Sequence, residues 1–131
     1  MKNIGVFAVI VNNGKILLGK RNYGNYGWTL PGGAVEERED LMHALVREVK
    51  EETNQNIKIE KYVLTSYNKE QYSIALIYKC SIIGERKIKY CKRELSDVKW
   101  CDLEKLPKEI TERQVKWIEY AKGNNVGVIE I

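Results

Sequence analysis

The first part of the chain has a pattern that predicts a hairpin. An apolar run at residues 4–11 and a mixed segment at residues 15–20 flank Asn13-Gly14, and both turn residues tolerate positive φ. The apolar run is too short to cross a membrane and is not followed by a small-residue cleavage pattern. We therefore expect a buried strand there, with no signal peptide or membrane segment.

Further strands and two helices follow. β-branched and aromatic residues predict strands at residues 57–67 and 72–83 and a short one at 98–101. Residues 41–53 contain neither Gly nor Pro and predict a helix, and a second helix is expected at about residues 111–121. The order strands, helix, strands, helix predicts an α/β sandwich with a mixed β-sheet.

The connections have their own chemistry. Residues 22–28 are rich in Gly and aromatic side chains and are expected to form a loop, and residues 85–93 form a basic loop. Between them, Pro31-Gly32-Gly33 predicts a forced turn whose glycines allow another part of the molecule to approach the backbone closely.

The first helix carries acidic side chains on its apolar face. Apolar residues recur from Leu41 to Val49 at the spacing of one helical face. When these residues are projected down the helix axis, Glu48 and Glu52 fall within this face and Glu51 borders it. Burying carboxylates costs free energy, the helix dipole already places negative charge at this end, and the like charges repel one another.

Two ways of compensating these buried carboxylates remain open, and so does an interpretation that needs no compensation. Arg47 can pair with one carboxylate but is poorly placed to neutralise three. A hard divalent cation such as Mg²⁺ or Mn²⁺ accepts a cluster of carboxylate oxygens. A solvated helix face would also accommodate this spacing of glutamates.

Composition and charge narrow the class of protein. A chain of 131 residues with 44% hydrophobic residues predicts one folded domain over residues 1–131 and excludes disorder as a description of the whole. Residues 33–54 hold seven acidic and three basic side chains, whereas the whole chain has a net charge of +4. An acidic region on a basic body suits a cation bound beside an anionic ligand. Three cysteines without a CxxC pair predict reduced thiols in a cytoplasmic protein: Cys80, Cys91 and Cys101.

The spacing of the acidic residues resembles the signature of the Nudix hydrolases. That signature reads G, five residues, E, seven residues, R-E-U-x-E-E-x-G-U, where U is a bulky aliphatic residue. The chain departs from it at Asn54, which stands for the last Gly, and at Gln55, which stands for the aliphatic residue; we expect Ile57 to supply the lost core contact. Pro31-Gly32 precedes the box, and Trp100 to Leu103 with Leu106-Pro107 resembles the family's closing strand and the start of its last helix. The matching positions are Gly33, Glu39, Arg47, Glu48, Val49, Glu51 and Glu52 within a box at about residues 33–55.

The resemblance implies an α/β/α sandwich fold and the hydrolysis of a nucleoside diphosphate linked to another group. It implies that Glu48, Glu51 and Glu52, with a backbone carbonyl of Gly32, hold Mg²⁺, for which Mn²⁺ can substitute. Arg47 would then orient the glutamates, Glu39 would support the loop and the start of the helix, and Glu94 would be a further carboxylate. The bound metal would lower the pKa of a water that attacks phosphorus in line. Glu51, Glu52 and Glu94 all stay open as the general base.

Residues that contact the substrate lie mostly outside the box. Arg21 and Lys20 are candidates for phosphate, and Tyr23, Tyr26 and Trp28 for stacking on a base, although Trp28 also suits the core. Weaker candidates for substrate contact lie near a strand connection, at Tyr67, Asn68 and Tyr72. Within the box, Gly33 and Glu36 are also candidates for substrate contact. His43 is expected on the solvated surface. The basic residues Lys87, Lys89, Lys92 and Arg93 suit either RNA or a solvated loop, and the loop is favoured.

The leading function is hydrolysis of a nucleoside triphosphate or an oxidised nucleotide to the nucleoside monophosphate and pyrophosphate. The alternatives are hydrolysis of nucleotide sugars, dinucleoside polyphosphates or RNA 5′ ends, and a sensor that binds a nucleotide without cleaving it. We expect a monomer or homodimer that takes a small nucleotide, without a membrane partner.

Overall fold

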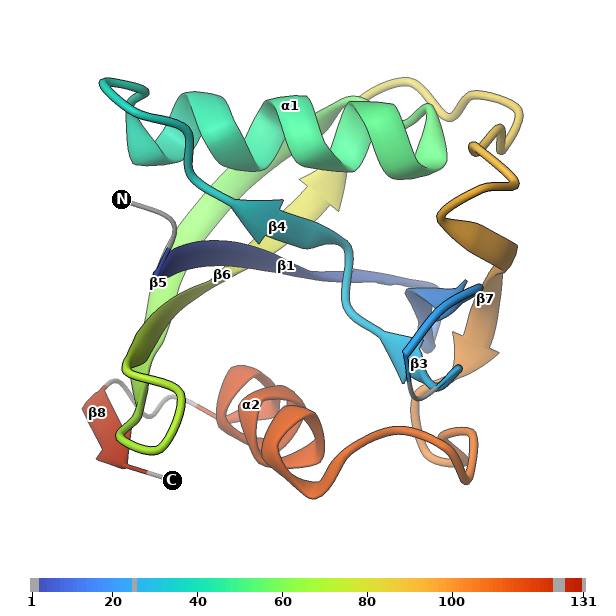
Figure 1. Ribbon diagram of the computed structural model, residues 1–131. Helices are drawn as coiled ribbons and strands as arrows, with labels where there is room; N and C mark the ends of the chain where they lie inside the picture. The colour runs from blue at the N-terminus through green and yellow to red at the C-terminus, as the bar shows by residue number, and fades with distance from the viewer. Residues whose placement is uncertain (1–2, 25, 124–126, 131) are drawn as a thin grey trace.

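The protein folds into two helices on opposite sides of a layer of strands (Figure 1). The computed structural model describes residues 3–24, 26–123 and 127–130. Its elements in chain order are β1 (Ile4–Asn12), β2 (Lys15–Arg21), β3 (Trp28–Thr29), β4 (Gly32–Ala34), α1 (Leu41–Thr53), β5 (Ile57–Asn68), β6 (Ser73–Ile82), β7 (Leu95–Asp102), α2 (Glu112–Lys122) and β8 (Gly127–Glu130). This arrangement confirms the expected α/β/α sandwich. In the described part of the chain, both helices fall short of the length and apolar character that crossing a bilayer requires.

The sheet is mixed, as the pattern of elements predicted. Hydrogen-bonded neighbours follow the order β3-β2-β1-β6-β5-β8, with β4 joined to β1 and β7 joined to β2. β1 runs parallel to β6 and β5 runs parallel to β8, whereas β5 and β6 form an antiparallel hairpin. β1 therefore lies at the centre of the fold, in contact with strands from both halves of the chain.

The predicted hairpin between β1 and β2 is confirmed, but its pairing is brief. Asn13 and Gly14 both have positive φ, at 52° and 76°. Paired residues are Val11 with Ile16 and Asn12 with Lys15. Beyond this point the strands separate, because β1 pairs with β4 and β6 while β2 pairs with β3 and β7.

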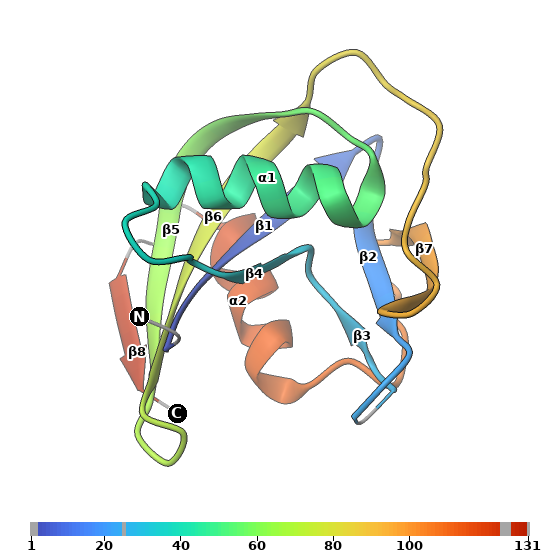
Figure 2. The same ribbon diagram turned by 45° about the horizontal axis from the view of Figure 1, so that its top comes forward.

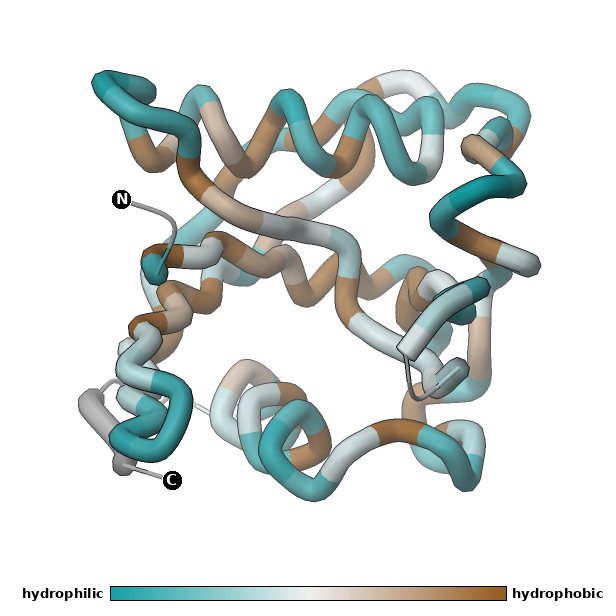
Figure 3. Tube along the Cα trace, in the orientation of Figure 1, coloured by the Kyte–Doolittle hydropathy of each residue, from teal (hydrophilic) through white to brown (hydrophobic). Residues whose placement is uncertain are grey.

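Alternate residues of β1 belong to two hydrophobic cores. Val6, Ala8 and Ile10 pack in the core beneath α1, and Val9 packs in the core covered by α2. A strand covered on both faces needs apolar side chains on both, which explains the uninterrupted apolar run. Figure 3 shows this run along β1 and the apolar positions of α1 on the side that faces the sheet.

Two expectations about local structure were wrong, and one strand was missed. Pro31-Gly32-Gly33 does not form a turn: Gly32 and Gly33 belong to β4 and pair with Phe7 and Val6 of β1. β7 starts at Leu95 rather than at residue 98, because it pairs with β2 along almost its whole length. β8 had no predicted counterpart, and it pairs with the end of β5.

Candidate active site

Helix α1 holds the three glutamates at different depths. Its buried residues are Ala44, Leu45, Val49 and Thr53, so the predicted inward face is confirmed. The side chain of Glu48 is 16% exposed and that of Glu51 is 59% exposed, while Glu52 is partly buried. The helical projection therefore separated the two inward glutamates from the one at the border.

Strand β4 lies against this face of α1 and brings backbone to the carboxylates. The Gly32 N–H donates a hydrogen bond of 2.8 Å to Oε1 of Glu52. At Gly33, a Cβ atom would lie 2.7 Å from Oε2 of Glu48. The lack of a side chain at Gly33 thus lets the backbone approach the Glu48 carboxylate closely, as the sequence predicted, although the segment is a strand.

The inward carboxylates are only partly compensated by positive charge. Burial raises the pKa of Glu52 to about 8; the hydrogen bond from Gly32 opposes the rise, and the charges of Glu48, Glu94 and Glu51 add to it. Burial also raises the pKa of Glu48, against the effect of Arg47. No ion pair of Glu52 occurs among the described residues. The negative charge on this face is therefore only partly neutralised by the protein itself.

Arg47 reaches more carboxylates than we expected. Its Nε and Nη2 donate to the two oxygens of Glu39 at 2.7 and 2.9 Å, and its Nη1 donates to Glu48 at 3.0 Å. Glu51 lies 3.5 Å and Glu36 lies 3.6 Å from the same Nη1. The expectation of one partner is thus corrected, because the loop before α1 and the helix itself both place carboxylates beside this guanidinium.

Glu39 is the best-compensated acid of the region. The hydrogen bond from Arg47 is the largest cause that lowers the pKa of Glu39 to about 2. Glu39 also accepts the N–H of Glu36 at 3.0 Å, and Nδ1 of His43 lies 2.8 Å from it. His43 is exposed, as expected, but it pairs with Glu39 rather than being only solvated. Glu39 thus ties the loop before α1 to the helix.

The donors suit a hard divalent cation, but they are not gathered for one. Carboxylate oxygens are the ligands that Mg²⁺ and Mn²⁺ prefer, and a Glu52 carboxylate without an ion pair in the described residues, beside the partly compensated Glu48, favours such a cation. Within the described ranges, no group of three or more His, Cys, Asp or Glu side chains is close enough to hold a metal. Glu48 turns to Arg47, Glu52 turns to Gly32, and Glu51 is exposed.

A cavity of about 130 Å³ opens beside Glu52. It brings together several residues that the sequence singled out, from elements far apart in the chain. Glu94 comes from the loop before β7, and Arg21 and Tyr23 come from the end of β2 and the loop after it. The predicted residues that line this cavity are Arg21, Tyr23, Gly32, Gly33, Glu52 and Glu94.

Other predicted substrate contacts lie elsewhere. Trp28 is 7% exposed and packs in the core covered by α2, with Nζ of Lys99 4.9 Å from its ring centroid. Of the two roles expected for it, core packing is confirmed and stacking on a base is wrong. Tyr72 is exposed at the tip of the β5–β6 hairpin and lines a separate depression with Tyr67. Glu36 is exposed and faces Arg47 rather than the cavity beside Glu52.

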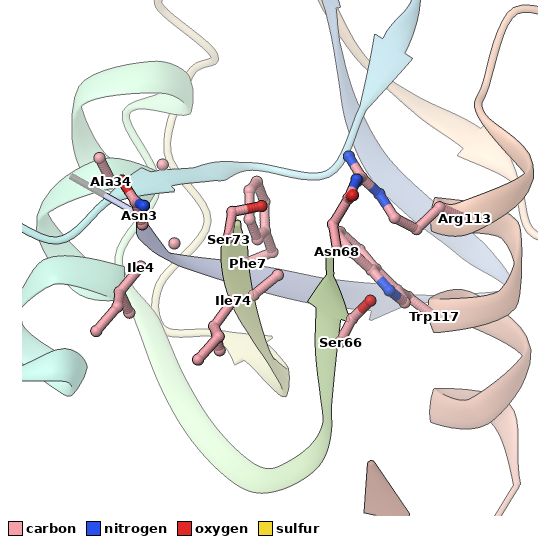
Figure 4. A pocket seen from close by; sticks show the side chains of 13 residues that line it. Asn3, Ile4, Phe7, Ala34, Ser66, Asn68, Ser73, Ile74, Arg113 and Trp117 are labelled. Atoms are coloured by element: carbon pink, nitrogen blue, oxygen red, sulfur yellow. The ribbon is translucent and has the colours of Figure 1, made fainter. Parts of the chain in front are cut away.

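A second cavity, of about 200 Å³, lies between the sheet and α2 (Figure 4). Phe7 and Gly33 line both cavities, so the two spaces are neighbours. Among its other residues, sequence reasoning singled out only Asn68. Ser66 on β5 and Arg113 and Trp117 on α2 were missed, although the spacing of the last two places them on one face of the helix.

Asn54 and Gln55, the two residues that depart from the family pattern, both hydrogen-bond to the β6–β7 loop. This loop, residues 83–94, passes the end of α1 (Figure 2). Asn54 has the expected positive φ of 65° and donates from Nδ2 to the Lys87 carbonyl at 2.8 Å. Gln55 is 1% exposed; it donates to the Arg86 carbonyl at 2.6 Å and accepts the Arg86 N–H at 3.1 Å. Ile57 is buried in the core under α1, as expected.

Gln55→Leu should loosen this loop without emptying the core. Leucine retains the apolar volume but leaves the Arg86 N–H and carbonyl without partners, so hydrogen exchange at the Arg86 amide should accelerate by about tenfold, the equivalent of one lost hydrogen bond. Gln71→Leu, at an exposed glutamine in the β5–β6 turn, is the matched control and should leave this amide unchanged. Unchanged exchange in Gln55→Leu would show that the side chain does not hold the loop.

Comparisons with known proteins agree with the fold described above. The family model for the NUDIX domain matches residues 1–121. An RNA pyrophosphohydrolase of Pelagibacter ubique is 31% identical over 123 residues, which cover 78% of this chain and 77% of that protein. A MutT-like protein of Streptomyces ambofaciens is 28% identical over 116 residues, or 88% of this chain and 71% of that protein. An ADP-ribose pyrophosphatase from Streptococcus suis has the same fold over 100% of both chains, with a TM-score of 0.78 and 20% identity.

Proposed function

Since the chain belongs to the NUDIX family of hydrolases, we propose that it hydrolyses a diphosphate bond in a nucleoside triphosphate or an oxidised nucleotide, releasing the nucleoside monophosphate and pyrophosphate. The observation that carries this proposal is Glu52, a partly buried carboxylate without an ion pair in the described residues, beside a cavity that also contains Arg21 and Glu94. The ADP-ribose pyrophosphatase that shares this fold acts, by its name, on a small nucleotide, which supports a substrate of that size.

Enzymes of this family generally use a divalent metal ion. In this chain Glu48, Glu51 and Glu52, with the carbonyl of Gly32, would hold it, and we take Mg²⁺ as the ion, with Mn²⁺ as a substitute. When bound, the metal neutralises phosphate charge and makes a bound water more acidic. The three carboxylates would supply the negative oxygens for this purpose, and Glu52 is the one that lines the cavity.

The remaining residues bind the substrate or orient the glutamates. Arg47 keeps Glu48 and Glu39 in fixed positions through the hydrogen bonds described above. Arg21, on the wall of the cavity, would bind a phosphate group of the substrate. The proton of the attacking water needs an acceptor within hydrogen-bond reach, and Glu51, Glu52 and Glu94 are the candidates.

RNA 5′ ends are the second candidate substrate. The β6–β7 loop carries five exposed basic residues next to Glu94, and such a surface attracts a phosphate backbone. The similarity to an RNA pyrophosphohydrolase points the same way. The five residues are Arg86, Lys87, Lys89, Lys92 and Arg93.

We also place the protein in the cytoplasm, where its cysteines would stay reduced, as a monomer or homodimer.

A nucleotide panel with product identification tests the proposal. We expect pyrophosphate release from one or more nucleoside triphosphates, including oxidised ones, with Mg²⁺, and none after chelation with EDTA. A parallel reaction with a 5′-triphosphate RNA measures the second candidate, and nucleotide sugars and dinucleoside polyphosphates complete the panel. If no diphosphate compound is turned over with either Mg²⁺ or Mn²⁺, the protein is not a hydrolase of this kind.

A further inference from the structure

The carboxylate of Glu94 has no side-chain contact that fixes it in place. Glu94 lines the cavity beside Glu52 and is exposed. Within the described ranges, the Glu94 carboxylate takes part in no hydrogen bond or ion pair. The Glu52 carboxylate, in contrast, accepts the Gly32 N–H at 2.8 Å. The place of the Glu94 carboxylate therefore depends on the backbone that carries it.

That backbone is a tight turn immediately before β7. The Cys91 carbonyl accepts the N–H of Glu94 at 3.1 Å and the N–H of Leu95 at 3.0 Å. Residues 91–94 are all exposed, and Leu95 is the first buried residue after them. A segment that buries so little apolar area opens easily unless hydrogen bonds from neighbouring elements hold it. Contacts from outside the turn therefore decide how firmly Glu94 is held.

Asn22, the residue after β2, supplies such contacts. Its N–H donates to the Glu94 carbonyl at 2.9 Å, and its Nδ2 donates to the Lys92 carbonyl at 2.7 Å. In the chain Asn22 lies between Arg21 and Tyr23, which both line the cavity beside Glu52. One residue thus connects the segment that carries two of the cavity residues to the turn that carries a third.

An irregularity in the β2–β7 ladder brings Asn22 to the turn. The pairing is regular over residues 15–20 of β2 and then shifts by one residue, so that Arg21 pairs with Leu95. A bulge of this kind moves every later residue of the strand pair by one position. It therefore places Asn22 opposite Glu94. Figure 2 shows the end of β2 beside the start of β7.

We propose that Asn22 is a positioning residue, which holds the turn of residues 91–94 so that the Glu94 carboxylate stays in the cavity beside Glu52. The proposal rests on the proposed function, since it assumes that Glu94 takes part in the hydrolysis. Asn22 acts through the backbone of the turn, because its N–H and its Nδ2 both bind carbonyls there. Its side chain should therefore affect kcat more than KM.

Hydrogen exchange tests the hold on the turn without any reaction. Asn22→Ala removes the bond to the Lys92 carbonyl and retains the backbone bond to Glu94, so the chain should still fold. The Glu94 amide should then exchange about tenfold faster than in the wild-type protein, as measured by NMR without metal or nucleotide. Asp102→Ala is the matched control. Asp102 is exposed at the far end of β7 and accepts the Glu104 N–H at 2.9 Å, so this variant also loses one surface hydrogen bond but should leave the Glu94 amide unchanged.

Kinetics with a hydrolysed nucleotide test whether the hold acts through Glu94. Asn22→Ala should lower kcat by about tenfold and change KM by less than about twofold. Glu94→Gln should also lower kcat. Adding Asn22→Ala to Glu94→Gln should lower kcat further by less than about twofold, because the carboxylate that Asn22 positions is then absent. Asp102→Ala should retain the wild-type kcat.

Three results would overturn the proposal. They are unchanged exchange at the Glu94 amide in Asn22→Ala, an unchanged kcat in the same variant, and a kcat loss of equal size with and without the Glu94 carboxylate. Faster exchange in a protein that hydrolyses no diphosphate compound would instead refute the proposed function and still support the hold of Asn22 on the turn.

Discussion

Glu52→Gln should reduce the turnover of a nucleoside triphosphate by two to three orders of magnitude, on the scale of about 10²–10³-fold for a lost charge-stabilising group. The amide still accepts the hydrogen bond from Gly32, so the fold should be retained, but it offers no charged oxygen to a cation. Steady-state kinetics at saturating Mg²⁺ give the change in kcat, and circular dichroism checks the fold. Near-normal turnover in a folded variant would remove Glu52 from the proposed metal site.

The same variant should be more stable than the wild-type protein when metal is removed. In the folded chain the pKa of Glu52 is raised from 4.5 to about 8, so between these values the folded state binds more protons than the unfolded state, and stability falls as pH rises. Above pH 8 the gain from Glu52→Gln should be on the order of 3 kcal/mol, and it should vanish below the unfolded pKa.

Urea unfolding with EDTA at pH 5 and pH 9 measures this gain. Glu51→Gln is the matched control, since the exposed Glu51 side chain should change the free energy of unfolding little at either pH. Adding Mg²⁺ at pH 9 should stabilise the wild-type protein more than Glu52→Gln. A Glu52→Gln variant that is less stable than wild type at pH 9 with EDTA would contradict the assignment of uncompensated charge to this site.

Gly32→Ala should have the largest effect on the fold. A Cβ atom at this position would lie 2.1 Å from the Val6 carbonyl oxygen and 2.7 Å from the Phe7 Cα, and φ is +150°. Because backbone atoms of the central strand cannot give way as a flexible side chain does, we expect the free energy of unfolding to fall by about 3 kcal/mol or more.

Gly84→Ala separates the backbone effect from the clash. Gly84 also has positive φ, at +58°, but nothing lies within 4 Å of its Cβ position. It should therefore lose only about 1 kcal/mol. Thermal or urea unfolding of both variants gives the comparison, and equal losses would mean that contact between β4 and β1 is not what requires glycine at residue 32.

Local patterns predicted local structure well. The face of α1 and the depth of its glutamates follow from helical periodicity alone, and Asn54 ends the helix in the left-handed conformation as expected. Pro31-Gly32-Gly33 was misread because proline and glycine are typical of turns, whereas the partner that makes this segment a strand is β1, more than twenty residues earlier. Pairing between distant segments is not visible in a local pattern.

In the candidate site, too, local features were predicted and contacts between distant segments were not. The box carboxylates and Glu94 were predicted from the spacing and the resemblance, and the structure brings Glu94 beside Glu52. The contact of Arg47 with Glu36 depends on the path of the loop before α1, and the hydrogen bond from Gln55 to Arg86 depends on the path of the β6–β7 loop. The sequence therefore indicated neither contact. Ser66 and Trp117 line one cavity only because α2 packs on the sheet, and each alone looks like an ordinary core residue.

The β6–β7 loop has a useful property for spectroscopy. Of the three cysteines, Cys80 and Cys101 are buried and only Cys91 is exposed. The Cys91 carbonyl accepts the N–H of Glu94 at 3.1 Å, so the two residues share one turn of the loop. A maleimide dye or nitroxide spin label would therefore attach to the unmodified chain at a single accessible thiol, three residues from the Glu94 carboxylate that lines the cavity, and would report on the surroundings of that turn when a ligand is added.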